Sequence, residues 1–111
     1  MKSARASQRA KKRDEAMAFV EQALAESPGA SEAMALKAEL LYDAGQKAQA
    51  LGICNSAVSA NPSNADAWLT KGLIHLDMGD NNQARAAFTK YLELRPTGGR
   101  SDDVRGLLDS L

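Results

Sequence analysis

The sequence predicts an all-α protein, an α-solenoid of about six helices stacked as antiparallel pairs. The chain is rich in alanine and only 5% aromatic, which favours close-packed helices over sheet. Its only three prolines, Pro28, Pro62 and Pro96, are each separated by 34 residues. Gly45 and Gly79 follow the same spacing. A fixed period of this length is the signature of stacked helical repeats.

The chain opens with a basic arm, residues 1–13. It holds six of the fourteen basic residues and no acidic one, which leaves eight basic against fourteen acidic residues in the remainder. Nucleic acid, an anionic membrane or an acidic partner would each attract such an arm. A solvated helix start is the simpler interpretation, and no aromatic residue is interleaved to stack on bases. We therefore expect a protein rather than nucleic acid or a membrane as the partner, and an adaptor that binds nucleic acid or a membrane through the arm stays an alternative hypothesis. The arm is expected to extend the first helix or to stay mobile.

We expect residues 14–111 to form one domain, which the 34-residue period divides into complete and partial repeats. Residues 14–28 match only the second helix of a pair, because Pro28 disfavours helix in the residue before it. Residues 31–64 form a complete pair, in which a helix starts at Ser31, breaks at Gly45 and is followed by a second helix that Pro62 closes. No apolar run approaches the roughly 18–20 residues that span a bilayer.

The next pair, residues 65–98, carries the clearest helix signals. Ser63 to Asp66 predicts a capping box, and Asp80 to Gln83 a second one. Gly79 ends the first helix, since glycine reaches the left-handed conformation at little cost. Residues 101–111 match a closing helix that Ser101 caps and in which Asp102 and Asp103 suit the positive end of the helix dipole.

As a set, these positions resemble the tetratricopeptide repeat (TPR) family. The second pair fits through Trp68, Gly72, His75, Gly79, Ala84, Phe88, Tyr91 and Pro96, and the first through Met34, Ala38, Leu41, Gly45, Ala50, Cys54, Ala57 and Pro62. The resemblance implies a right-handed superhelix. Lys37, Lys71 and Arg105 stand where the family often has leucine, and we expect their stems to pack while their charges reach water. Tyr91, in a usually small position, is expected to splay the last helices slightly.

The resemblance also implies that the first helices line a concave groove that binds a peptide or a partner's helix. The groove residues expected on this basis are Glu39, Tyr42, Asp66, Leu69, Leu73, Leu76, Asp77 and Asp103, with Glu32, Ala35, Leu107 and Ser110 beside them. An apolar strip edged by acids suits a protein segment with apolar anchors and basic flanks. The alternative is that these leucines pack on the closing helix and on one another.

One branch of the family grips the C-terminal carboxylate of heat-shock chaperones with asparagine and basic residues. The corresponding positions here resemble Leu69, Thr70 and Leu73, with no asparagine, which argues against that clamp.

No residue pattern indicates catalysis, a cofactor or a metal, so we expect no enzyme. His75 and Cys54 fall on packed helix faces, where a core role is the simpler interpretation. Asp102-Asp103 is interpreted as a helix start, and Gly98-Gly99 lacks the lysine-serine pair of a phosphate loop. A second hypothesis is a structural element that stacks through its terminal helices, which leaves a homo-oligomer open.

Overall fold

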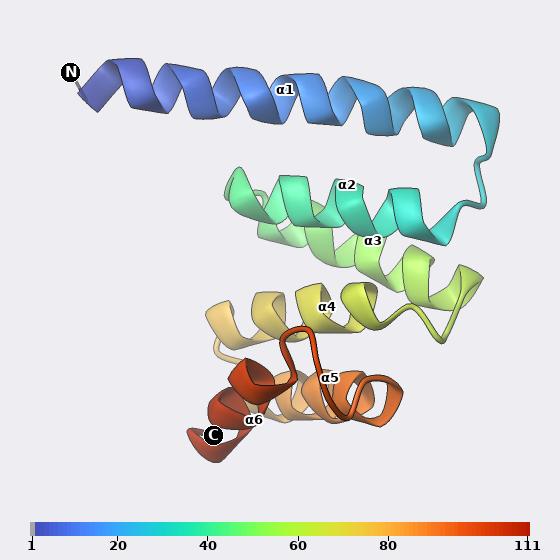
Figure 1. Ribbon diagram of the computed structural model, residues 1–111, viewed down its shortest axis with the longest axis vertical. Coiled ribbons are helices and arrows are strands. Elements are labelled where there is room, and N and C mark those ends of the chain that lie inside the picture. Colours follow the sequence, from blue (N-terminus) through green and yellow to red (C-terminus); the bar gives the residue numbers. More distant parts are fainter. Residues whose placement is uncertain (1) are drawn as a thin grey trace.

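The computed structural model describes residues 2–111, with side chains from residue 11 onward. Six helices and no strand are present in this part of the chain (Figure 1). The helices are α1 (Lys2–Glu26), α2 (Ser31–Asp43), α3 (Lys47–Ala60), α4 (Ala65–Asp77), α5 (Asn81–Leu94) and α6 (Ser101–Asp109). None of them is long and apolar enough to cross a membrane.

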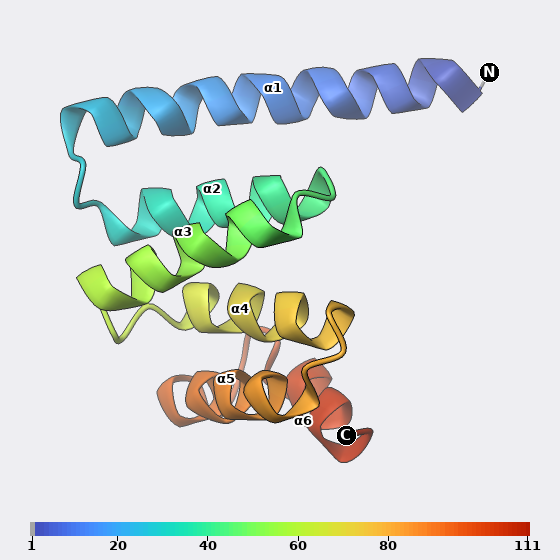
Figure 2. The ribbon, with the colours of Figure 1, turned by 180° about the vertical axis from the view of Figure 1, so that it is seen from behind.

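The helices stack in chain order from α1 at one end to α6 at the other. In Figure 1, α2 lies in front of α3 and α6 in front of α5, and the order is reversed in Figure 2. The first helices of the pairs therefore share one face of the stack, and the second helices share the other. Helix α1 extends well beyond the end of α2, because the helix continues through the basic arm to Lys2 (Figure 1).

The turns within pairs form as predicted. Gly45 and Gly79 take φ values of 84° and 80°, the left-handed region that favours glycine. Asp80 caps α5, since its carboxylate accepts a hydrogen bond from the Gln83 backbone N–H at 3.3 Å. The capping box predicted from Ser63 at α4 is displaced by one residue, because the N-cap is Asn64, whose side chain accepts a hydrogen bond from the Ala67 N–H at 3.3 Å.

The prediction that Ser101 caps α6 is wrong. Arg100 occupies the N-cap position without a side-chain cap bond, and the Ser101 hydroxyl donates instead to the Arg95 carbonyl at 2.6 Å. The reason lies in the loop, where Gly98 and Gly99 both have positive φ. They turn the chain so that Ser101 enters the first turn of α6 beside the end of α5.

The interior consists of small helix-contact residues with a few large side chains between them. Phe88 and Tyr91 are buried with Leu69 and Val104 in a C-terminal cluster. A Cβ added to Gly72 would lie 2.5 Å from the Phe88 ring, so the absence of a side chain at Gly72 lets α4 and α5 approach closely. Tyr91 is accommodated because its hydroxyl accepts a hydrogen bond from the Arg100 N–H at 3.2 Å.

The three cations expected in place of leucine keep their charges engaged at the surface. The ammonium of Lys37 lies 2.7 Å from the Glu21 carboxylate. The ammonium of Lys71 lies 5.2 Å from the centroid of the Trp68 ring, a cation–π distance. Arg105 donates to Asp102 and to the Pro96 carbonyl.

The outer side of α6 differs from the equivalent sides of α2 and α4. One repeat earlier the same registers hold Trp68, Lys71, Gly72 and His75. There Gly72 lies against Phe88 of α5, and Trp68 packs against the C-terminal cluster. The corresponding side of α6 is exposed and polar, and it consists of Asp102, Arg105, Gly106 and Asp109. This end of the stack therefore presents charge to solvent.

Candidate functional site: a concave groove

A groove runs along the first helices and is made of three adjoining hollows. The central hollow, about 520 Å³, lies between α2 and α4 and is closed by Arg100. It is lined by Glu39, Tyr42, Asp43, Asp66, Leu69, Thr70, Leu73 and Arg100. Because it shares Glu39 and Asp66 with one neighbouring hollow and Leu69, Leu73 and Arg100 with the other, the three form one continuous surface.

The C-terminal hollow, about 220 Å³, is the apolar part of the groove. Its walls are Leu69 and Leu73 from α4 and Val104 and Leu107 from α6. Leu69 is only 7% exposed and belongs to the C-terminal cluster, so it mainly supports the floor. Leu73 and Leu107 are half-buried and present the accessible apolar surface.

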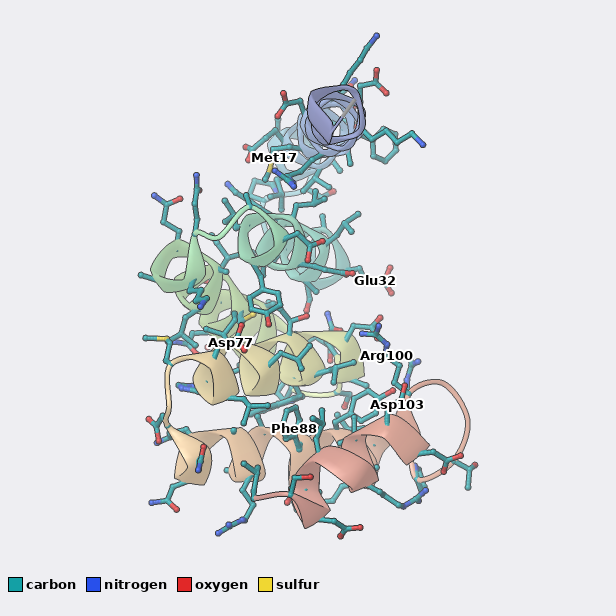
Figure 3. All side chains as sticks on the ribbon, turned by 90° about the vertical axis from the view of Figure 1, so that its left-hand side faces the viewer. Met17, Glu32, Asp77, Phe88, Arg100 and Asp103 are labelled. Carbon is teal, nitrogen blue, oxygen red and sulfur yellow. The ribbon has the colours of Figure 1, made fainter. Side chains whose placement is uncertain are left out.

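The third hollow, about 500 Å³, lies at the other end, where α2 meets the α3–α4 turn. Glu32, Glu39 and Asp66 supply carboxylates, and Arg95 supplies a guanidinium. Leu36, which is exposed, adds an apolar side chain. Figure 3 shows Glu32, Arg100 and Asp103 on the same side of the stack, so charged residues from α2 and from the start of α6 edge one surface.

A buried polar network fixes the spacing of α2 and α4 beneath this surface. The Asn64 side-chain amide donates to the Ser31 hydroxyl at 2.9 Å, and that hydroxyl donates to the Ala57 carbonyl at 2.8 Å. Asn64 also caps α4. Because buried polar groups are costly unless they are paired, these bonds favour one relative position of the two helices.

Tyr42 and Asp77 connect the two helix pairs where α2 and α4 end. The Tyr42 hydroxyl donates to the Asp77 carboxylate at 2.6 Å, and the Lys47 ammonium lies 3.9 Å from the same oxygen. Burial, together with the hydrogen bond to Asp77 and the negative charges nearby, raises the pKa of Tyr42 to about 12. Tyr42 therefore remains a hydrogen-bond donor at neutral pH.

The structure brings six of the eight expected groove residues to these hollows: Glu39, Tyr42, Asp66, Leu69, Leu73 and Asp103. Leu76 and Asp77 do not line them. Leu76 packs against the C-terminal cluster, as Leu73 and Leu107 also do, which is the packing that the alternative interpretation of these leucines expects. Asp77 accepts a hydrogen bond from Tyr42. The Ser110 hydroxyl donates back to the Gly106 carbonyl within α6.

Sequence reasoning missed the two arginines of the groove, Arg95 and Arg100. Both belong to the connection between α5 and α6, whose course depends on the positive φ values of Gly98 and Gly99. Among the residues with described side chains, neither guanidinium has a carboxylate within 4.0 Å. Each is therefore available to a ligand.

Cys54 and His75, the two residues that the sequence analysis weighed for catalysis, do not line the groove. Cys54 is fully buried, and burial raises the pKa of its thiol to about 12, so it is protonated at neutral pH. Burial lowers the pKa of His75, whose Nδ1 lies 3.9 Å from an Asp80 oxygen. Both match the packed roles expected from their registers.

Helical hairpins that repeat every 34 residues and stack around a concave face define a helical-repeat protein. Two tetratricopeptide repeat matches cover residues 8–74 and 65–97. The chain belongs to the tetratricopeptide repeat family. A comparison with curated protein sequences gave no match.

Solved structures of TPR domains superpose on nearly the whole chain. The Sgt2 TPR domain from Aspergillus fumigatus is 27% identical, with a TM-score of 0.80 over 98% of this chain and 72% of that one. The Arabidopsis OM64 TPR domain is 20% identical, with a TM-score of 0.80 over 96% and 88%. The first TPR of Spaghetti (RPAP3), solved with the HSP90 peptide SRMEEVD, is 20% identical, with a TM-score of 0.78 over 98% and 87%.

Proposed function

We propose that this chain is a non-catalytic protein-interaction module that binds a segment of a partner protein in the groove, as a scaffold or adaptor in a larger assembly. The observation that carries the proposal is the continuity of the three hollows across α2, α4 and α6. A structural neighbour holds a peptide, which supports a peptide as the class of ligand.

The charges along the groove support a particular chemistry for the bound segment. Glu32, Glu39 and Asp66 attract basic side chains toward the α2 end, although Arg95 lies beside them. Leu73 and Leu107 offer an apolar contact at the α6 end, where the Arg100 guanidinium can pair with a carboxylate of the segment. We infer a segment with one or two apolar anchors and basic residues on the side facing α2.

The acidic peptide held by the Spaghetti domain does not match this pattern. Its sequence, SRMEEVD, carries three acids, which would approach the carboxylates of Glu39 and Asp66. Like charges across an interface are unfavourable. We therefore propose that this groove discriminates against acidic chaperone tails, in agreement with the missing asparagine at Leu69, Thr70 and Leu73.

The test is a peptide-array screen followed by titration of the best ligand by calorimetry. Peptides with apolar anchors and basic flanks should bind, and SRMEEVD should not. The variant Glu39→Lys/Asp66→Lys should weaken the selected peptide at least about tenfold, because two attractive charges become repulsive. Glu93→Lys, an exposed substitution on α5, is the matched control and should bind normally. If wild type, the double variant and Glu93→Lys all bind the peptide equally, the groove is not the binding site.

A further inference from the structure

One side of α1 carries the most exposed large apolar side chain recorded in the structure, Phe19, which is 72% exposed. The residues in the same register one and two repeats later are Ile53 and Ala87. Ile53 packs against the cluster that contains Ala38 and Leu41 of α2, and Ala87 is 2% exposed. In both complete pairs this register is covered. In the described part of the chain, α1 lies at one end of the stack and contacts α2 alone among the helices (Figures 1 and 2), and Phe19 stays exposed.

The exposed residues around Phe19 form a stripe along α1 whose two end residues carry opposite charges. Lys12, Glu15, Phe19, Gln22 and Glu26 are all exposed, and their spacing of three and four residues places them along one side of a helix. Lys12 lies seven residues before Phe19 and Glu26 seven residues after it. The stripe therefore has a base at one end, an aromatic ring at its centre and an acid at the other end, with Glu15 as a second acid between Lys12 and Phe19.

We propose that this stripe binds a second copy of the same chain, with the two α1 helices antiparallel and crossing at Phe19. In this arrangement each Lys12 faces Glu26 of the other copy, and the two Phe19 rings meet on the two-fold axis. A parallel arrangement would place Lys12 against Lys12 and Glu26 against Glu26. An isologous contact needs a self-complementary surface, and only the antiparallel pairing makes this stripe self-complementary.

The other end of the stack argues against head-to-tail stacking. An α6 from a second copy would present Asp102, Arg105 and Asp109 to Phe19, which leaves the ring without an apolar partner. Two α1 helices give each Phe19 an aromatic neighbour, and aromatic pairs add attraction beyond their buried area. The helices would also be antiparallel, as the two helices of each complete pair are. Lys12 also lines a hollow with Leu40 and Asp43 of α2, but no residue of the stripe lines the three hollows of the groove. The inference therefore does not rest on the proposed function.

The test is sedimentation equilibrium of the full chain over a concentration series. Wild type should pass from 11.8 kDa to twice that mass as concentration rises. Phe19→Asp should weaken association at least about tenfold, because it places two carboxylates at the crossing point. Met78→Asp replaces another exposed apolar residue, 53% exposed after α4, and should associate like wild type. Circular dichroism should show the same helix content in all variants.

A charge swap tests the antiparallel register. Lys12→Glu and Glu26→Lys should each weaken association about threefold to tenfold, since each variant puts like charges together twice. The double variant Lys12→Glu/Glu26→Lys should restore it, because both ion pairs re-form with reversed sign. A mass of 11.8 kDa at every concentration, a dimer indifferent to Phe19→Asp, or a double variant weaker than either single one would each overturn the proposal.

Discussion

Gly72→Ala should destabilise the protein, although alanine is the better helix former. The new methyl group would lie 2.5 Å and 2.6 Å from two ring carbons of Phe88, whereas carbon atoms prefer about 3.5–4.0 Å. The ring would have to move by roughly 1 Å, and it has no room, since Phe88 is fully buried. Overpacking of this kind costs about 1–3 kcal/mol, against a gain of about 0.5–1 kcal/mol from replacing glycine in a helix.

The assay is urea unfolding followed by circular dichroism and by the fluorescence of Trp68, the only tryptophan. Gly52→Ala provides the matched control, because it lies within α3 and an added Cβ meets nothing within 4 Å. It should stabilise by about 0.5–1 kcal/mol, opposite in sign to Gly72→Ala.

A double-mutant cycle identifies the cause. Phe88→Ala alone should cost about 3–5 kcal/mol by leaving a cavity. In that background Gly72→Ala should become neutral or stabilising, because the ring it collides with is gone. If Gly72→Ala instead stabilises the wild-type protein as much as Gly52→Ala does, the close approach of α4 and α5 at this point is refuted.

Two further predictions concern buried ionisable groups. Burial lowers the pKa of His75 in the folded state, so the unfolded chain binds a proton more readily and the free energy of unfolding should fall as pH drops below about 6.5. Between pH 7.5 and pH 5.5 the free energy of unfolding should decrease less for His75→Gln than for wild type, and equal decreases would contradict this. Burial raises the pKa of Cys54 to about 12, so native protein at pH 8 should react with a thiol reagent only at its unfolding rate; an immediate reaction would show that the thiol is accessible.

The period of the sequence predicted the helix pairs because the residues that set it act locally. Pro62 and Pro96 lie just beyond the ends of α3 and α5, and Gly45 and Gly79 take the left-handed turn that only glycine adopts easily. Cys54 and Phe88 share a register and are both fully buried, as expected. Such features depend on a few neighbouring residues and can be predicted without knowing the rest of the fold.

The edges of the candidate groove were harder to predict, because they depend on contacts between distant segments. Arg100 reaches the groove only through the double-glycine loop, where its N–H binds the Tyr91 hydroxyl. Leu76 has the helical spacing of a groove residue and packs against the C-terminal cluster as Leu73 does, yet it lines none of the three hollows. Serine is a common helix-capping residue, but the Arg95 carbonyl at the end of α5 lies close enough to accept a hydrogen bond from the Ser101 hydroxyl.

The charged outer side of α6 is a poor contact surface for an apolar helix. A further helix docked there would remove Asp102, Arg105 and Asp109 from water, at several kcal/mol for each ion left without a partner, and would gain little apolar contact in return. The inner side of α6 differs, because Asp103 and Leu107 line the C-terminal hollow there. A single nine-residue helix thus presents charge on its outer side and lines the candidate groove on its inner side.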